Sequence, residues 1–240
     1  MGRSETLTTK GRPMKVYIDE PAGPGPHPAV IVAHHRWGIE EVTQDNVHRL
    51  ARAGMVAAAP EHYFRRPPGE ENAASLRGVS DADFHDSVEA TIAYLNAMKS
   101  VEKGDIGIFG QCMGGRTAFL IASTFPMKAC CALYSGGMMA ARGGDGPAPI
   151  DLLGNIACPI IGFFGNDDAN PSPADVDRIA ATLKSRGKTF EFHRYDGAGH
   201  AFQNFKEASY RKEASDDAWS KLIPFFQKTL VVKAPQAANS

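Results

Sequence analysis

Three side chains of the types that carry out nucleophilic catalysis occur along the chain in the order cysteine, aspartate, histidine. Cys112 lies in DIGIFGQCMGGRTAF, Asp167 in GFFGNDDANPSP and His200 in YDGAGHAF. A thiol nucleophile needs a base to accept its proton, and the base needs a carboxylate to orient it. We therefore take Cys112 as the candidate nucleophile, His200 as the base and Asp167 as the orienting acid. The neighbouring Asp168 is the alternative acid.

The residues around Cys112 favour a sharp turn between a strand and a helix. An apolar run ends at Gly110, and Gly114 and Gly115 follow the cysteine. This is the G-x-nucleophile-x-G pattern, with cysteine where serine is usual. The helix N-terminus favours a thiolate, and the N–H of Met113 can face a substrate oxyanion. The alternative is a buried structural cysteine beside two packing glycines.

We predict that the other three cysteines are thiols buried in the core; they are Cys130, Cys131 and Cys158. Two of them are adjacent in an apolar run, and the chain has no C-x-x-C pair and no zinc-ligand spacing. It also has no G-x-G-x-x-G or Walker A motif. We therefore expect no disulfide, no metal site and no cofactor.

Strand and helix patterns alternate along the chain and must position these residues. Buried strands are predicted at 29–33, 55–59, 106–109, 128–134 and 159–164, and a half-buried strand at 189–195. Helices are predicted at 42–53, from Ser80 to Leu95, at 113–124, from Pro173 to Leu183, and around Trp219–Phe226 with a kink at Pro224. This order predicts a mainly parallel central sheet with helices on both faces.

The three candidates each follow a predicted parallel strand, which is where open α/β sheets bind ligands. Their chain order is that of the α/β-hydrolase fold, so we expect this fold for a single domain, 1–240. Antiparallel edge strands are expected within 6–18, and a frayed tail at 232–240. The Gly- and Ala-rich segment 136–150 has two interpretations, a mobile loop near the site or an inert surface connection.

The charge balance excludes several classes of partner. The 240 residues include 26 basic and 27 acidic side chains, a net charge of −1, which argues against a nucleic-acid binder. The chain has no apolar run of about 18 residues and no apolar N-terminal signal region, so we expect no membrane span and a reducing cytoplasm. We expect a small-molecule substrate and a monomer or small homo-oligomer.

Five phrases along the chain are similar to those of dienelactone hydrolases, the carboxymethylenebutenolidases. They are VIVAHHRWG, AAAPEHYFR, GIFGQCMGG, FGNDD with a following proline, and GAGHAF. The resemblance implies an α/β-hydrolase fold and a triad of Cys112, Asp167 and His200. It also implies an oxyanion hole made by the N–H groups of Met113 and Arg36.

The chain departs from that family at two pocket positions. The family has a glutamate at the position of His35, where it helps to deprotonate the cysteine. His35 either takes over that role or only hydrogen-bonds a neighbouring loop. The family also holds the substrate carboxylate with arginines; one corresponds to the neutral Asn204, and Arg77 is a candidate for another. We expect His35, Trp37 and Asn204 at the nucleophile or in the substrate pocket, and a substrate other than a dienelactone.

The sequence thus predicts an ester or lactone hydrolase that acts through a thioester on Cys112. Two other interpretations remain. The same triad could hydrolyse phosphotriesters or thioesters, or Cys112 could be a redox-sensing thiol in a protein without catalysis.

Overall fold

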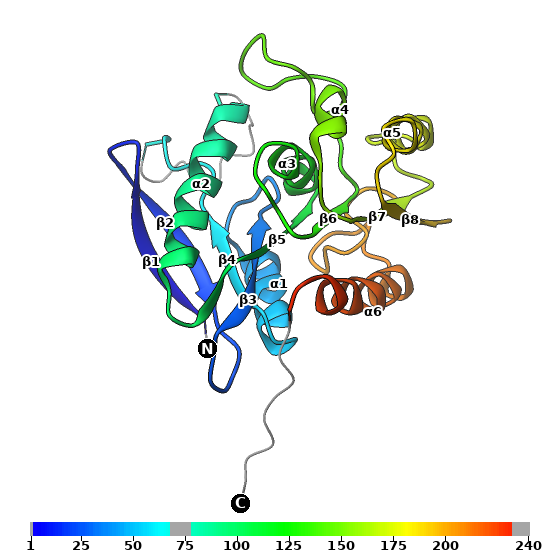
Figure 1. Cartoon of the computed structure of the whole chain (residues 1–240). Coiled ribbons are helices and arrows are strands. Elements are labelled where there is room, and N and C mark those ends of the chain that lie inside the picture. The colour runs from blue at the N-terminus through cyan, green and yellow to red at the C-terminus, as the bar shows by residue number, and fades with distance from the viewer. Residues whose placement is uncertain (1, 68–77, 232–240) are drawn as a thin grey trace, which may run out of the picture.

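The strands pair into one central sheet of eight strands (Figure 1). The computed structural model describes residues 2–67 and 78–231, so the expected tail 232–240 and Arg77 lie outside it. The strands are β1 (Arg3–Thr9), β2 (Arg12–Asp19), β3 (His27–Ala33), β4 (Val56–Pro60), β5 (Val101–Gln111), β6 (Cys130–Leu133), β7 (Ile160–Gly165) and β8 (Phe190–Tyr195).

The strand order across the sheet is β1-β2-β4-β3-β5-β6-β7-β8. Strands β3 to β8 run parallel to one another, with Ile31 opposite Ile108 between β3 and β5. The expected mainly parallel sheet is therefore confirmed. Strand β1 pairs antiparallel with β2, and β2 pairs antiparallel with β4, so the N-terminal hairpin forms the edge of the sheet.

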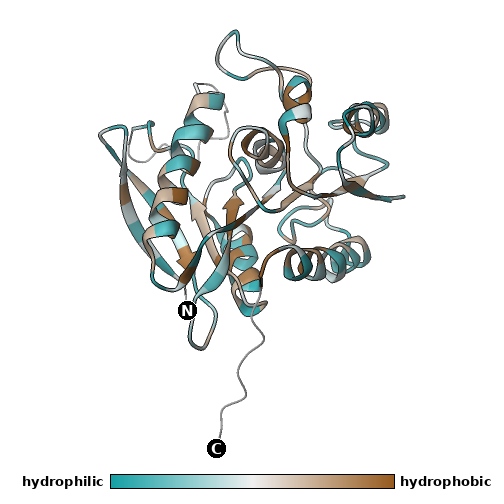
Figure 2. Cartoon of the chain, in the orientation of Figure 1, coloured by the Kyte–Doolittle hydropathy of each residue, from teal (hydrophilic) through white to brown (hydrophobic). Residues whose placement is uncertain are grey.

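Helices cover both faces of the sheet (Figure 1). They are α1 (Glu41–Arg52), α2 (Asp81–Ala97), α3 (Met113–Ala122), α4 (Pro149–Leu152), α5 (Pro173–Ser185) and α6 (Lys212–Thr229), with a 3₁₀ turn η1 (Leu153–Asn155) after α4. Val47 of α1 and Phe226 of α6 belong to one apolar cluster, and Val88 of α2 and Ile179 of α5 belong to a second. Figure 2 shows the corresponding apolar colouring on the central strands and on helix stretches that face them.

Local sequence signals account for several helix ends. Ser80 caps α2 in a capping box with Asp83, as its position before the helix predicted. Gly54 follows α1 with φ of 98°, a left-handed conformation that glycine adopts without a steric penalty. Pro224 lies inside α6, which is one helix from Lys212 to Thr229. None of the helices within residues 2–67 and 78–231 is long and apolar enough to cross a membrane.

Strand β5 is longer than its apolar run suggested. It begins at Val101 and ends at Gln111, directly before Cys112. The segments that carry the aspartate pair and His200 follow β7 and β8 in the same way. Because these strands are parallel, their carboxyl ends meet at one edge of the sheet, and this edge carries the candidate site.

Candidate active site

Cys112 occupies a strained turn between β5 and α3. Its φ is 57° and its ψ is −118°, a conformation that is costly for a residue with a side chain. A Cβ atom at Gly110 would lie 2.0 Å from the carbonyl oxygen of Gly114, and one at Gly114 would lie 1.9 Å from that of Ala33. The two glycines therefore allow the backbones to approach closely enough to form the turn.

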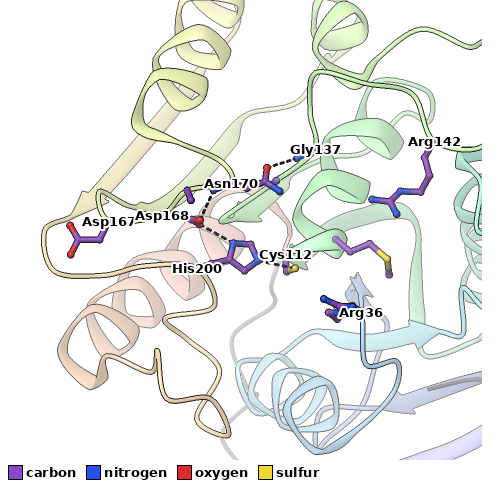
Figure 3. Close-up of a pocket in the computed structure, with 11 residues that line it drawn as sticks. Arg36, Cys112, Gly137, Arg142, Asp167, Asp168, Asn170 and His200 are labelled. Carbon is purple, nitrogen blue, oxygen red and sulfur yellow. Dashed lines mark hydrogen bonds and ion pairs between the residues drawn. The ribbon is translucent and has the colours of Figure 1, made fainter. Parts of the chain in front are cut away.

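His200 lies between the cysteine and a carboxylate (Figure 3). Its Nε2 is 3.0 Å from Cys112 Sγ, and its Nδ1 is 2.9 Å from Asp168 Oδ2. Asp168 is 4% exposed, and its Oδ1 accepts a hydrogen bond of 2.8 Å from the N–H of Asn170. Both carboxylate oxygens are thus engaged, which holds the orientation of the imidazole.

The expectation that Asp167 contacts His200 is wrong. Asp167 is exposed, and its backbone N–H donates to the carbonyl oxygen of Ala198 over 3.0 Å. Its side chain points away from His200, whereas Asp168 points toward it (Figure 3). The reason is local geometry. The chain turns after β7, so two consecutive side chains leave the backbone in different directions, and the second one faces the histidine loop.

The charges around His200 stabilise its protonated form. Burial by itself would lower the pKa of His200. The hydrogen bonds to Asp168 and to the Cys112 sulfur outweigh burial and raise the pKa to about 10. The ring is therefore an imidazolium at neutral pH, with both nitrogens as donors. The protonated ring donates from Nε2 to the Cys112 sulfur and from Nδ1 to the Asp168 carboxylate.

Met113 and Arg36 both line the pocket at Cys112, and their role as an oxyanion hole stays a prediction. Met113 is the first residue of α3, where backbone N–H groups have no acceptor within the helix. The Tyr63 hydroxyl donates to the carbonyl oxygen of Arg36 over 2.8 Å and lies 3.5 Å from the Met113 sulfur. Tyr63 is buried at 1% exposure, so it connects the two segments rigidly.

Two pockets meet at Cys112. The first has a volume of about 530 Å³, and the second about 370 Å³. Both include Cys112, Arg36 and His200. Arg142 lines only the first pocket, and Asn204 lines only the second. A substrate could therefore extend from the sulfur in two directions.

His35 lines the second pocket and binds a neighbouring loop residue. Its Nε2 lies 2.6 Å from Glu40 Oε1, and the same Glu40 oxygen caps α1 by accepting the N–H of Val42. Of the two interpretations of His35, this geometry favours the loop hydrogen bond. The nitrogen at the Cys112 sulfur belongs to His200 instead.

Trp37 and Asn204 also line the second pocket. The Trp37 side chain is 37% exposed, and the Arg36 guanidinium lies 5.1 Å from the centre of its ring. Asn204 is buried, and its side-chain oxygen accepts the N–H of Lys206 over 3.0 Å. This pocket therefore has aromatic surfaces from Trp37 and Tyr134, and a neutral amide at the position where the resemblance implied an arginine.

Three residues at or beside the first pocket were not identified from the sequence. Asn170 and Arg142 line it, and Tyr63 connects its two backbone segments. Tyr63 lies in the AAAPEHYFR phrase, which resembles the family but carries no catalytic motif of its own. Arg142 lies in the segment 136–150, for which a position near the site was one of two interpretations. The structure supports a position near the site, since Gly136 and Gly137 line the same pocket, and the mobility of this loop stays a prediction.

The other cysteines do not take part in this arrangement. Cys130, Cys131 and Cys158 are buried free thiols, and burial raises the pKa of Cys158 to about 11. They are therefore protonated and poorly reactive at neutral pH. No group of histidine, cysteine and acidic side chains in residues 2–67 and 78–231 is suited to hold a metal ion.

Comparison with known proteins identifies the family. The sequence model of the "Dienelactone hydrolase family" matches residues 14–230. A "Putative carboxymethylenebutenolidase" of Synechocystis is 32% identical, with 94% of this chain and 96% of the relative covered. One of the same name in Escherichia coli K12 is 29% identical, covering 93% and 85%.

Solved structures agree with this result. The structure titled "Putative Dienelactone Hydrolase from Klebsiella pneumoniae" superposes with a TM-score of 0.86 at 27% identity, and the match covers 95% of this chain and 98% of that one. The dienelactone hydrolase-like phosphotriesterase P91 shares the fold, with a TM-score of 0.81 at 18% identity over 96% of this chain and 98% of that one. The chain therefore has the α/β-hydrolase fold, and it is a hydrolase that belongs to the dienelactone hydrolase family.

Proposed function

We propose that this protein hydrolyses esters or lactones of small molecules through a triad of Cys112, His200 and Asp168. The observation that supports this most directly is the continuous contact from Cys112 Sγ through the two nitrogens of His200 to the buried Asp168 carboxylate. A merely structural cysteine would have no need of a strained backbone beside a pocket, or of an oriented imidazolium.

In the first half of the reaction, the Cys112 thiolate attacks the acyl carbonyl carbon and the C–S bond forms. The negative charge that develops on the carbonyl oxygen is stabilised by the N–H groups of Met113 and Arg36. The tetrahedral intermediate then expels the alkoxide, which takes its proton from His200 Nε2. The products of this half are an alcohol and a thioester on Cys112.

In the second half, neutral His200 accepts a proton from water as the water oxygen attacks the thioester carbon. The same two N–H groups stabilise the second oxyanion. Collapse of this intermediate breaks the C–S bond and releases the carboxylic acid. The sulfur leaves as a thiolate beside protonated His200, which restores the starting ion pair.

The substrate is expected to occupy both pockets that meet at Cys112. The name shared by the relatives suggests a lactone, and pockets of about 530 and 370 Å³ fit a small molecule. Asn204 supplies an amide and no positive charge to the second pocket. The Arg36 guanidinium and the Glu207 carboxylate also line this pocket and offset each other, so a substrate part placed there is expected to be neutral.

Kinetics of the Cys112→Ala variant test the proposal. With p-nitrophenyl butyrate and a simple lactone, the variant should lose hydrolysis by at least about 10³-fold, because the covalent route is removed. Cys158→Ala is the matched control, since it removes a buried thiol outside both pockets and should keep turnover per folded molecule. Full activity of Cys112→Ala would refute the assignment.

Mass spectrometry separates the other interpretations. Mixing the wild-type protein with p-nitrophenyl butyrate or the lactone should add one acyl group to Cys112. Rapid peroxide oxidation of Cys112 without any ester turnover would instead indicate a redox sensor. Faster turnover of a phosphotriester or a thioester than of every ester and lactone would keep the triad and change the substrate class.

A further inference from the structure

Arg142 places a positive charge in the wall of the first pocket. It lies in the segment between β6 and α4, and its side chain extends toward the space beside Cys112 (Figure 3). Its Nε is buried and has no hydrogen-bond partner among the described residues. A buried donor without an acceptor is costly unless a ligand or water supplies one.

The backbone of Arg142 is held on both sides by one aspartate. The N–H of Arg142 donates to Asp81 Oδ2 over 3.0 Å, and its carbonyl oxygen accepts the N–H of Asp81 over 2.9 Å. Asp81 is the first residue of α2, a long helix packed against the sheet. The position of Arg142 is therefore determined by the core of the protein and not by the loop alone.

Arg116 of α3 holds the preceding part of the same loop. It is 1% exposed, and it donates to the carbonyl oxygens of Gly137 over 2.9 Å and Ala140 over 2.8 Å. Its guanidinium also forms a two-point ion pair with the Asp81 carboxylate. Two α-helices and a buried ion pair thus fix the loop that carries Arg142.

This arrangement leaves an excess of positive charge at the pocket wall. The Asp81 carboxylate forms its ion pair with the Arg116 guanidinium, and from Arg142 it accepts only the backbone N–H. Burial and the neighbouring Arg116 lower the pKa of Arg142, and guanidinium groups nevertheless remain charged at neutral pH. Arg36, Arg142 and protonated His200 line this pocket together with two carboxylates, the exposed Asp167 and Asp168, and Asp168 is already engaged by His200 and Asn170.

We propose that Arg142 is a specificity-determining residue that binds an anionic group of the substrate in the first pocket. The compensating charge then comes from the substrate, and the buried Nε gains its acceptor. The proposal rests on the function proposed for Cys112 and names the substrate class: an ester or lactone with a carboxylate or a similar compact anion. Asp81 and Arg116 are positioning residues for Arg142.

The two pockets therefore have different roles. The pocket with Arg142 receives the charged end of the substrate, and the pocket with Trp37 and Asn204 receives the neutral end. The absence of an arginine at position 204 changes the side on which an anion binds, and does not remove anion recognition from the site.

Paired esters test the proposal. Arg142→Gln is compared with wild type on p-nitrophenyl butyrate, on mono-p-nitrophenyl glutarate with an anionic acyl part, and on 4-(butyryloxy)benzoate with an anionic leaving group. The loss in kcat/KM for at least one anionic ester should exceed the loss for the neutral ester by about 10- to 100-fold, the range of a charge-assisted hydrogen bond. Arg142→Lys should recover part of the preference, because it retains the charge but not the planar fork.

The matched control is Arg52→Gln, which removes the same charge from the exposed end of α1. It should leave the ratio between the esters unchanged. Asp81→Asn should raise KM for the preferred anionic ester more than it lowers kcat, because it displaces Arg142 without touching the reacting atoms. Equal losses on all three esters in Arg142→Gln would overturn the proposal.

A binding measurement keeps this inference separate from the proposed chemistry. Titration calorimetry of glutarate and benzoate into Cys112→Ala needs no turnover. At least one of the two anions should bind, and Arg142→Gln in that background should weaken it by about 10-fold or more. Normal Cys112-dependent ester hydrolysis with no anion binding would refute only the role of Arg142. Arg142-dependent anion binding without hydrolysis would refute only the proposed catalysis.

Discussion

A comparison of two single variants, Asp168→Asn and Asp167→Asn, tests the arrangement of the site most directly. The two substitutions are chemically identical and adjacent in sequence. Asp168 is 4% exposed and lies 2.9 Å from His200, whereas Asp167 is exposed and points away from the ring. Any difference between the variants therefore reports the orientation of these side chains and not local composition.

The expected loss follows from the two bonds of the Asp168 carboxylate. One oxygen faces His200 Nδ1 and the other accepts the N–H of Asn170 over 2.8 Å. An asparagine that keeps its oxygen on Asn170 presents an NH₂ group to Nδ1, which is then unable to carry a proton. A charge-assisted hydrogen bond alone accounts for a loss of about 10- to 150-fold. The wrong tautomer in a triad extends the loss to about 10⁴-fold.

The pH profile supplies a second readout. The pKa of His200 is raised to about 10 in the folded protein, so wild type should keep its proton donor until the pH approaches that value. Asp168→Asn removes the carboxylate that raises this pKa, and the alkaline limb of kcat should move to lower pH. By linkage, the proton on His200 stabilises the folded state fully below pH 6.5, and this contribution is lost as the pH rises through about 10. The loss of folding stability in Asp168→Asn, relative to wild type, should therefore be largest near pH 6.5 and should shrink as the pH rises toward about 10.

The assay is hydrolysis of p-nitrophenyl butyrate between about pH 5 and 10.5, with circular dichroism to confirm folding at each pH. Asp168→Asn should lose about 10² to 10⁴ in kcat/KM, and Asp167→Asn should remain within about threefold of wild type. Equal losses in the two variants, or a larger loss at Asp167, would show that the contact between Asp168 and His200 is not the functional one.

Two further substitutions test the supporting structure. Gly114→Ala should lower the free energy of unfolding by about 3 kcal/mol or more, because its Cβ would lie 1.9 Å from the Ala33 carbonyl oxygen. Denaturant unfolding measures this change. An unchanged free energy of unfolding would contradict the close approach of the two backbones. Gly144→Ala, whose Cβ would meet nothing within 4 Å, is its control. Ser172→Ala should cost about 1 kcal/mol in the same assay by removing the cap of α5, with kcat/KM unchanged; an unaltered midpoint would show that the capping box with Asp175 does not contribute.

Much of the framework could be predicted from local sequence. The turn at Cys112 is specified by glycines because a Cβ atom at Gly110 or Gly114 would overlap the backbone. The alternation of apolar strands and amphipathic helices predicted the parallel sheet because that arrangement buries both faces. The position of His200 after the last strand followed from the same pattern.

The tertiary structure decided what depends on side-chain direction and on contacts between distant segments. Asp167 and Asp168 are equivalent in type and adjacent in sequence, and only the turn after β7 places the second one against His200. Arg142 has no motif, and it reaches the pocket because Asp81, 61 residues earlier, binds its backbone. Composition and periodicity specify which residues are buried and where elements begin, because those are local or averaged properties. Which polar group faces which is set by the packing of the whole chain, because short-range hydrogen bonds require atoms to meet within about 3 Å.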